Sequence, residues 1–167
     1  MTNIVSRALV SLPREEGLLL INRNNLRAAL LPSEAVANLE DAVAARTPYP
    51  PGEFGDAIAE IGFAIPPDSP WYVHIVLRDR PAANFGRVTW EITERCNFRC
   101  VHCYLDEKEQ RGLPLTQRLQ VLDKLERAGC LWLQITGGEA LADPLFEETY
   151  RAAWERGMVI SVLTNGA

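Results

Sequence analysis

The strongest constraint on the fold is a change of rhythm after Gly86, where segments typical of strands begin to alternate with segments typical of helices. The pattern predicts strands at 88–93, 131–136 and 159–164, and helices at 116–128 and 144–156. Asp143 is the expected N-cap of the second helix, with Pro144 at its first position. Alternating strands and helices predict a parallel sheet with right-handed crossovers. We therefore predict an α/β domain over residues 86–167.

The first part of the chain has a different character. Apolar segments at 17–21 and 26–31 flank an asparagine-rich turn, which predicts a β-hairpin. Further elements expected here are a helix from Ser33, its N-cap, to Ala45, a short helix at 55–61 that ends at Gly62, and a strand at 71–77. Seven of the eleven prolines lie between Pro48 and Pro81, which indicates a loop-rich linker. Residues 1–85 thus resemble a small α+β, winged-helix-like module followed by a proline-rich linker.

Charge and hydropathy exclude several classes of partner. The 167 residues include 17 basic and 22 acidic side chains, a net charge of -5, and no basic cluster. Binding to nucleic acid is therefore not expected, because phosphate contacts need a basic face. No apolar run is long enough to cross a bilayer and no export-type apolar core begins the chain, so we expect a cytoplasmic protein without a membrane partner.

Three of the four cysteines, Cys96, Cys100 and Cys103, lie within eight residues, directly after the first predicted strand of the α/β domain. Disulfides that staple distant loops would spread the cysteines along the chain, so the crowding points to metal ligation in a reducing compartment. Thiolates favour iron–sulfur clusters or zinc. A structural zinc site takes four protein ligands, whereas a four-iron cluster with three cysteines keeps one iron open. Cys130 is expected to be a small core residue.

Polar motifs follow the other two strands of this domain. Gly137, Gly138 and Glu139 come after the second strand, and Thr164, Asn165 and Gly166 come after the third. The carboxyl ends of parallel strands lie at one edge of a sheet, so the three motifs should meet there. The glycines would allow a ligand to approach the backbone, and Glu139 would offer a carboxylate to a cation such as a ligand ammonium.

Polar residues also alternate with apolar ones inside the strands. Glu91, Gln134 and Ser161 would face a ligand-filled interior if helices cover the other face of the sheet. The alternative is that each of them bonds a neighbour at the edge of the sheet.

The ordered set C-x3-C-x2-C, G-G-E and T-N-G over residues 87–167 resembles the first half of a radical S-adenosylmethionine (SAM) enzyme. The resemblance implies a partial (βα) barrel, here truncated after the third strand, in which Cys96, Cys100 and Cys103 bind a [4Fe-4S] cluster. Its open iron would be chelated by the amino and carboxylate groups of SAM. The residues expected to bind SAM are Gly137, Gly138, Glu139, His102 and Asn165. Arg99 would either stabilise the reduced cluster or remain solvated.

The activity implied by this resemblance is reductive cleavage of SAM to methionine and a 5'-deoxyadenosyl radical, which abstracts hydrogen from a substrate. The electron would come from a flavodoxin- or ferredoxin-like donor. The first 85 residues are similar to the module that captures a leader peptide in peptide-modifying members, the RiPP maturases of the SPASM type. This likeness implies a precursor peptide as partner, added as a strand to a sheet edge.

Other interpretations of the cysteines remain. Cys100 and Cys103 could form a redox-active pair, or His102 could complete a zinc site with the three thiolates. The chain would then be a non-catalytic peptide-binding module with a zinc or degenerate cysteine site. The last predicted strand would be an uncovered apolar edge, so we expect the isolated chain to be poorly soluble or to need a partner.

Overall fold

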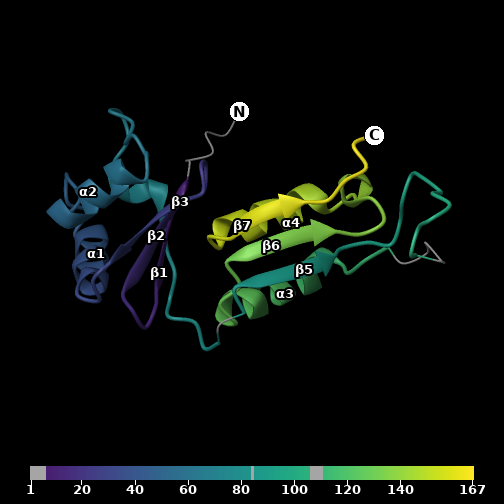
Figure 1. The fold of residues 1–167 in the computed structure, drawn as a ribbon, viewed down its shortest axis with the longest axis horizontal. Coiled ribbons are helices and arrows are strands. Elements are labelled where there is room, and N and C mark those ends of the chain that lie inside the picture. The colour runs from purple at the N-terminus through teal and green to yellow at the C-terminus, as the bar shows by residue number, and fades with distance from the viewer. Residues whose placement is uncertain (1–6, 84, 106–110) are drawn as a thin grey trace. The chain divides into compact units, whose positions relative to one another are not determined.

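The computed structural model describes residues 7–83, 85–105 and 111–167 (Figure 1). The chain divides into two compact units, Met1–Arg80 and Pro81–Ala167. Their boundary lies five residues before the one drawn from the sequence. Each unit has its own apolar core.

Unit 1 contains a four-stranded sheet in the order β3-β2-β1-β4. The strands are β1 (Leu9–Pro13), β2 (Leu18–Asn22), β3 (Arg27–Leu31) and β4 (Ile75–Leu77). Strands β2 and β3 form the predicted hairpin, and β1 pairs antiparallel with β2 and parallel with β4. Strand β1 was not predicted, although all five of its residues are buried. The outer strands of this sheet are β3 and β4.

The helices of unit 1 are α1 (Ala35–Ala44) and α2 (Gly52–Glu60). The N-cap prediction for Ser33 is wrong, because Glu34 occupies that position and no side chain caps the helix. Helix α2 ends at Glu60, and Gly62, the residue predicted to terminate it, follows the C-cap Ile61 with a φ of 71°. The strand expected at 71–77 is wrong in its first half. Pro70 instead starts a 3-10 turn, η1 (Trp71–His74), by accepting a hydrogen bond from the backbone of Val73.

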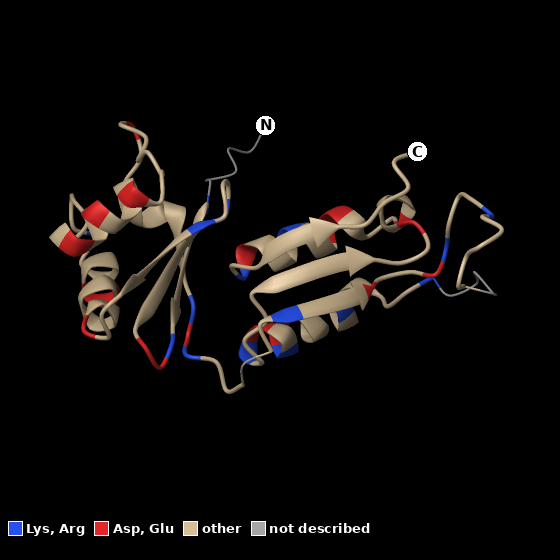
Figure 2. Ribbon diagram, viewed as in Figure 1, with Lys and Arg blue, Asp and Glu red and all other residues tan. Residues whose placement is uncertain are grey.

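The proline-rich segment is folded into unit 1. It contains α2, η1 and β4, and the buried Trp71 and Phe54 belong to the core of the unit. Helices α1 and α2 carry two and three acidic residues, respectively, and no lysine or arginine (Figure 2). Their charge is thus opposite to the one needed for contact with phosphate groups.

Unit 2 contains a parallel three-stranded sheet in the order β5-β6-β7, as predicted. Its elements are β5 (Arg87–Glu91), α3 (Leu115–Arg127), β6 (Trp132–Thr136), a short 3-10 turn η2 (Ala140–Ala142), α4 (Phe146–Glu155) and β7 (Val159–Val162). Both helices pack on one face of the sheet, where Leu122 of α3 and Ala153 of α4 join Leu133 and Ile135 of β6 in the core (Figure 1). The alternation of apolar residues therefore predicted the covered face correctly.

The start of α4 differs from the prediction by two residues. Asp143 accepts a hydrogen bond from the backbone of Leu145 at 2.8 Å, but Pro144 lies in a turn and the helix begins at Phe146. The carboxylate of Asp143 also binds Arg118, so it both accepts from the backbone ahead of α4 and forms a buried ion pair. Within the described residues, no helix is long and apolar enough to span a membrane.

Candidate functional site

The three polar motifs lie where the parallel strands end. We name residues 93–112, which join β5 to α3, the cysteine loop; its residues 106–110 lie outside the described part. The loop after β6 carries Gly137, Gly138 and Glu139, and the segment after β7 carries Asn165. Because the three strands run in one direction, all these segments leave the sheet at the same edge (Figure 1).

The two glycines pack directly on the backbone of the cysteine loop. The N–H of Gly138 donates to the carbonyl of Thr93 at 2.9 Å, and the N–H of Glu139 donates to the carbonyl of Arg95 at 2.8 Å. A Cβ atom on Gly137 would lie 2.2 Å from the Thr93 oxygen, and one on Gly138 would lie 2.4 Å from the Arg95 oxygen. Close packing therefore explains why both positions are glycine, because a side chain at either one would push the cysteine loop away.

Glu139 is buried, with 1 % of its surface exposed, and its carboxylate is well satisfied. Oε1 accepts from the backbone N–H of Leu141 at 2.8 Å, and Oε2 accepts from that of Asn165 at 2.7 Å. Burial by itself raises the pKa of Glu139, but these two hydrogen bonds and a third from the Thr164 hydroxyl lower it below its ordinary value. Glu139 therefore keeps a negative charge at neutral pH and ties the ends of β6 and β7 together.

Asn165 completes a chain of contacts back to the cysteines. Its side-chain amide donates to Oδ1 of Asn97 at 3.0 Å and lies 3.8 Å from Sγ of Cys96. The backbone N–H of Phe98 also points at that sulfur, at 3.3 Å. The structure therefore brings Cys96, Glu139 and Asn165 together, as the sequence predicted for the end of the sheet.

The other two cysteines lie further along the loop. All three thiols are free; Cys96 and Cys103 are half-buried, and Cys100 is exposed, as is His102. A turn joins Cys100 and Cys103, whose N–H donates to the Cys100 carbonyl at 3.2 Å. Across the described ranges, no three Cys, His, Asp or Glu residues are close enough together to hold a metal ion. The three thiols share one loop without converging on a point.

The chemistry of this donor set still fits an iron–sulfur cluster. Three free cysteines stand on a loop without regular secondary structure, which can rearrange around a metal centre. The first of them already has hydrogen-bond donors aimed at its sulfur, and such donors stabilise a negatively charged thiolate ligand.

The polar residues of the strands lie on the face opposite the helices. Thr89, Gln134 and Ser161 are in register across β5, β6 and β7; Thr89 and Ser161 are exposed and Gln134 is half-buried. Glu91 bonds a neighbour, because the Tyr104 hydroxyl donates to its Oε1 at 2.5 Å. This hydrogen bond, followed by burial and the charge of Glu91, raises the pKa of Tyr104 to about 12.

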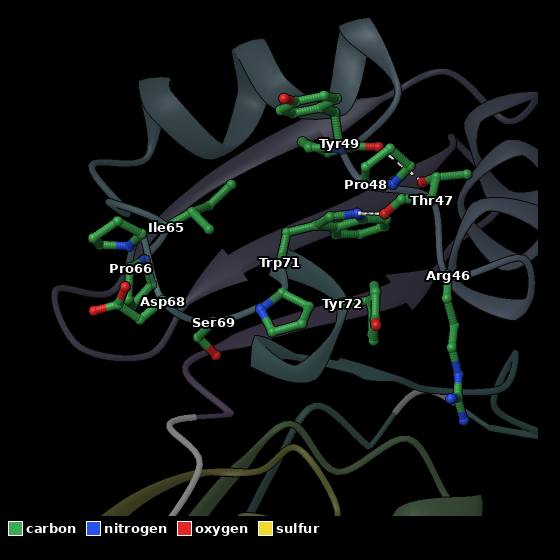
Figure 3. Close-up of a pocket in the computed structure, with 13 residues that line it drawn as sticks. Arg46, Thr47, Pro48, Tyr49, Ile65, Pro66, Asp68, Ser69, Trp71 and Tyr72 are labelled. Carbon is green, nitrogen blue, oxygen red and sulfur yellow. Dashed lines mark hydrogen bonds between the residues drawn. The ribbon is translucent and has the colours of Figure 1, made fainter.

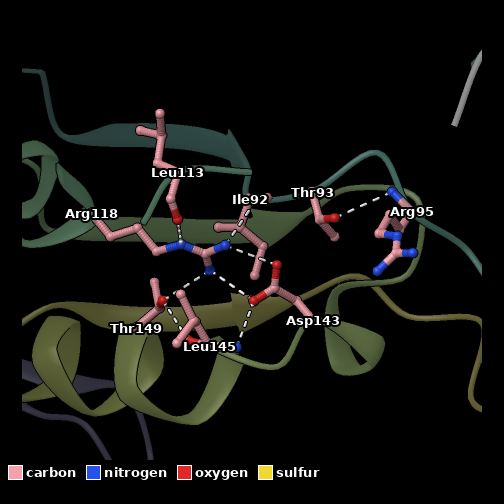
Figure 4. A network of polar contacts seen from close by, with 8 residues as sticks. All are labelled: Ile92, Thr93, Arg95, Leu113, Arg118, Asp143, Leu145 and Thr149. Carbon is pink, nitrogen blue, oxygen red and sulfur yellow. Dashed lines mark hydrogen bonds and ion pairs between the residues drawn. The ribbon is translucent and has the colours of Figure 1, made fainter. Parts of the chain in front are cut away.

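Sequence reasoning missed both Tyr104 and Arg118. Tyr104 directly follows Cys103, and its contact joins the cysteine loop to the end of β5. Arg118 is 1 % exposed and binds Asp143 between α3 and the loop before α4 (Figure 4). Its position four residues before the buried Leu122, on the apolar face of α3, is the signal that marks it as an internal charge.

Unit 1 has a pocket of its own, of about 640 Å³, in the proline-rich segment (Figure 3). Its lining includes Tyr49, Trp71 and Tyr72; the Trp71 indole N–H donates to the carbonyl of Thr47 at 2.9 Å. None of the residues predicted to bind the cluster or SAM line this pocket. All of its lining residues belong to unit 1.

Comparison with known proteins finds a family match within unit 2. Residues 90–167, just under half of the chain, match the family model of the Radical SAM superfamily. Its members are enzymes that use a [4Fe-4S] cluster and SAM.

Two curated relatives match about the same segment. The subtilosin biosynthesis protein AlbA of Bacillus subtilis is 35 % identical over 80 residues, which cover 47 % of this chain and 18 % of AlbA. The mycofactocin maturase MftC of Mycobacterium ulcerans is 36 % identical over 81 residues, which cover 47 % of this chain and 22 % of MftC. The chain thus matches about a fifth of the length of these relatives.

A solved structure extends the likeness to unit 1. SuiB of Streptococcus suis, crystallised with the precursor peptide SuiA, matches 96 % of this chain and 42 % of its own, with a TM-score of 0.53 and 16 % identity. SuiB has also been crystallised with SAM. At this identity the comparison shows a shared α/β fold over most of the chain.

Proposed function

We propose that unit 2 binds a [4Fe-4S] cluster through Cys96, Cys100 and Cys103 and takes part in the reductive cleavage of SAM. The observation that carries this proposal is the contact between the cysteine loop and the G-G-E loop. Two backbone hydrogen bonds join them, and Asn165 links Glu139 to Cys96 and Asn97. Cysteine ligands and an ionised carboxylate are thereby held at one edge of the sheet.

Each group has a defined task in this proposal. Glu139, ionised because its pKa is lowered, supplies the negative charge that favours an ammonium group beside the backbone of Gly137 and Gly138. The Phe98 N–H and the Asn165 amide stabilise the thiolate of Cys96. A cluster held by Cys96, Cys100 and Cys103 would supply the one electron needed for cleavage of the sulfonium of SAM to methionine and a 5'-deoxyadenosyl radical. The electron comes from a small flavodoxin- or ferredoxin-like donor.

The open face of the sheet is the proposed place for the substrate. Thr89, Gln134 and Ser161 form a polar row there, while the helices cover the other face. A substrate above this row would offer a hydrogen atom to the radical. His102, exposed beside Cys103, is a further proposed contact for SAM.

Anaerobic reconstitution with iron and sulfide tests the cluster proposal. The wild-type chain should bind iron with the visible absorption of an iron–sulfur cluster, and with a reductant and SAM it should form 5'-deoxyadenosine. Cys96→Ala, Cys100→Ala and Cys103→Ala should each lose the cluster. Cys130→Ala is the matched control and should keep it, because Cys130 is buried in the core of unit 2.

Two outcomes would favour the competing interpretations. Binding of zinc alone, without SAM cleavage, would indicate a zinc-loaded binding module. A disulfide between Cys100 and Cys103 that forms reversibly and leaves iron unbound would indicate thiol redox chemistry. Either result contradicts the cluster proposal.

We further propose that unit 1 is a winged-helix-like module that captures a precursor peptide along β3. This strand lies at one end of the sheet order, and its Arg27, Ala28 and Leu30 are exposed. An outer strand offers unpaired backbone groups to an added strand. The likeness to SuiB covers unit 1 as well as unit 2, which supports this assignment at the level of the fold.

Hydrogen exchange can locate the peptide. The probes are synthetic peptides, one for each short reading frame found next to the gene of this chain. At least one of them should slow amide exchange in 27–31 and leave 75–77, on the other outer strand, unchanged. Slower exchange in 75–77 alone, or no binding by any of them, would contradict capture by β3.

A further inference from the structure

One buried side chain joins the two ends of the cysteine loop, which we call its neck. The two ends of the loop meet at Ile92, which follows β5, and Leu113, which precedes α3. Arg118 donates from Nε to the Leu113 carbonyl at 2.6 Å and from Nη2 to the Ile92 carbonyl at 3.3 Å (Figure 4). One guanidinium group therefore holds both ends of the segment that carries the three cysteines.

The same group reaches the loop that follows the G-G-E motif. Nη1 and Nη2 of Arg118 donate to the two carboxylate oxygens of Asp143, at 2.9 and 2.8 Å, and Nη1 also donates to the Thr149 hydroxyl at 3.1 Å. All five N–H donors of the guanidinium are thus used. The pair is fully buried, and Asp143 in turn accepts from the backbone of Leu145.

The packing around this arginine leaves little freedom. Gly112, with a φ of 76°, lies so close to the neck that a Cβ atom would be 1.9 Å from the Ile92 oxygen and 2.8 Å from Nη2 of Arg118. The N–H of Ile92 donates to the carbonyl of Thr136, the residue before the G-G-E motif. The neck and the G-G-E loop are therefore parts of one hydrogen-bonded structure.

We propose that Arg118 and Asp143 are positioning residues that set the cysteine loop on the G-G-E loop. This inference rests on the function proposed above, since it concerns the loop that would hold the cluster. Neither residue is among the proposed ligands of the cluster or of SAM; Arg118 fixes the two ends of the loop, and Asp143 holds Arg118 in place. A lysine at 118 would keep the charge next to Asp143, but it could not reach two carbonyls and a carboxylate at once.

The control is another arginine that joins the same two helices. Arg156, the residue after α4, binds Asp123 of α3 at 2.7 Å. Among the described residues it has no contact with the cysteine loop. Arg156→Met should lower the stability of unit 2 without opening the neck. Thr149→Val is a second control, because it removes one partner of Arg118 and leaves both bonds to the neck.

Amide exchange of the chain without iron tests the inference directly. In Arg118→Lys, the N–H groups of Gly138 and Glu139 should exchange roughly tenfold faster, relative to Leu133 in β6, which reports global unfolding. In Arg156→Met and Thr149→Val this ratio should change less than about twofold. Equal ratios in Arg118→Lys and Arg156→Met would overturn the inference and reduce Arg118 to a general stabilising residue.

Reconstitution gives a second measurement. Iron retained per chain should fall severalfold in Arg118→Lys and stay at the wild-type level in Arg156→Met. Full retention in Arg118→Lys would contradict the positioning role. If the wild type itself binds no iron, the proposed function fails, while the exchange ratios still decide whether Arg118 positions the loop.

Discussion

The edge of the parallel sheet combines two regions of opposite character. The base consists of the G-G-E loop with Arg118 and Asp143, and its charged groups are buried and fully hydrogen-bonded. The arm is the described cysteine-bearing stretch 96–105, in which Val101 is completely exposed and Tyr104 is 71 % exposed. The base is built by the protein alone, whereas the arm makes few contacts with it.

This difference indicates that the base is formed before any ligand binds, whereas the arm can become ordered when a ligand binds. A preorganised base costs no rearrangement when a ligand binds, and it positions the groups that must be accurate. An open arm can close around a metal centre, so that binding energy contributes to its folding. The arm is tied to the base at its start, through Thr93 and Arg95, and by the contacts of Asn165 with Asn97 and Cys96.

The largest effect is expected for Asp143→Ala in the base. This change leaves the guanidinium of Arg118 buried without its carboxylate, and breaking a buried pair in this way costs about 3 to 5 kcal/mol. Urea denaturation of unit 2 measures the loss. As a control, Glu147→Ala removes an exposed ion pair with Arg151 and should cost less than about 0.5 kcal/mol. Similar losses of unfolding free energy in the two variants would show that the buried pair in the base contributes no more to stability than an exposed pair.

Gly138→Ala should be the next most damaging change. Its new methyl group would lie 2.4 Å from the carbonyl oxygens of both Glu94 and Arg95, so one of the loops must move. Overpacking of this kind costs about 1 to 3 kcal/mol. Gly86→Ala is the matched control, with no atom within 4 Å of the added group. A Gly138→Ala chain as stable as Gly86→Ala would show that the G-G-E loop does not pack on Glu94 and Arg95, just before the arm.

Glu139→Gln tests the charge of the base. Its carboxylate accepts hydrogen bonds from Leu141 and Asn165, and each bond to a charged group contributes about 1.5 to 3 kcal/mol. We expect a loss of about 2 kcal/mol at neutral pH, where one amide group cannot accept both bonds equally well.

The pH dependence of this loss follows from the lowered pKa of Glu139. A carboxyl group with a lower pKa in the folded state stabilises the protein above its unfolded value, about 4.3, and this contribution fades as the pH falls through the folded pKa. The difference in unfolding free energy between wild type and Glu139→Gln should therefore shrink below about pH 4. A difference that stays constant or grows on acidification would contradict the charge assignment.

Cys100→Ala should have the smallest effect on stability, although it should abolish the cluster. Cys100 is exposed in the arm, and changes at such positions usually stay within about 0.5 kcal/mol. Thermal unfolding of the chain without iron is the measurement. A loss comparable to that of Gly138→Ala would show that the arm is already part of the folded base.

The sequence predicted the parallel sheet, its helix-covered face and the convergence of Cys96, Glu139 and Asn165, because these depend on strand direction and residue alternation. It did not predict β1, whose buried residues LVSLP include a serine and a proline that interrupt an apolar pattern. From the sequence, the glycines of the G-G-E loop were expected only to let a ligand approach the backbone. Their actual neighbours, the carbonyls of Thr93 and Arg95, come from a segment about forty residues earlier, and local patterns carry no information about such contacts.

Arg118 was missed for a related reason. Helical periodicity places it on the apolar face of α3, but its partners, Asp143 and the carbonyls of Ile92 and Leu113, are assembled only by the tertiary fold. Asp143 was assigned as a helix cap, which describes one of its bonds and leaves out the ion pair.

The most direct test of this account is anaerobic hydrogen exchange of the chain before and after reconstitution with iron and sulfide. We predict that residues 96–105 become strongly protected when iron binds, while the amides of Gly138 and Glu139, already hydrogen-bonded to the loop, change little. Binding of iron that leaves 96–105 unprotected, or that first orders the G-G-E loop, would contradict a preformed base that receives a cluster through its cysteine arm.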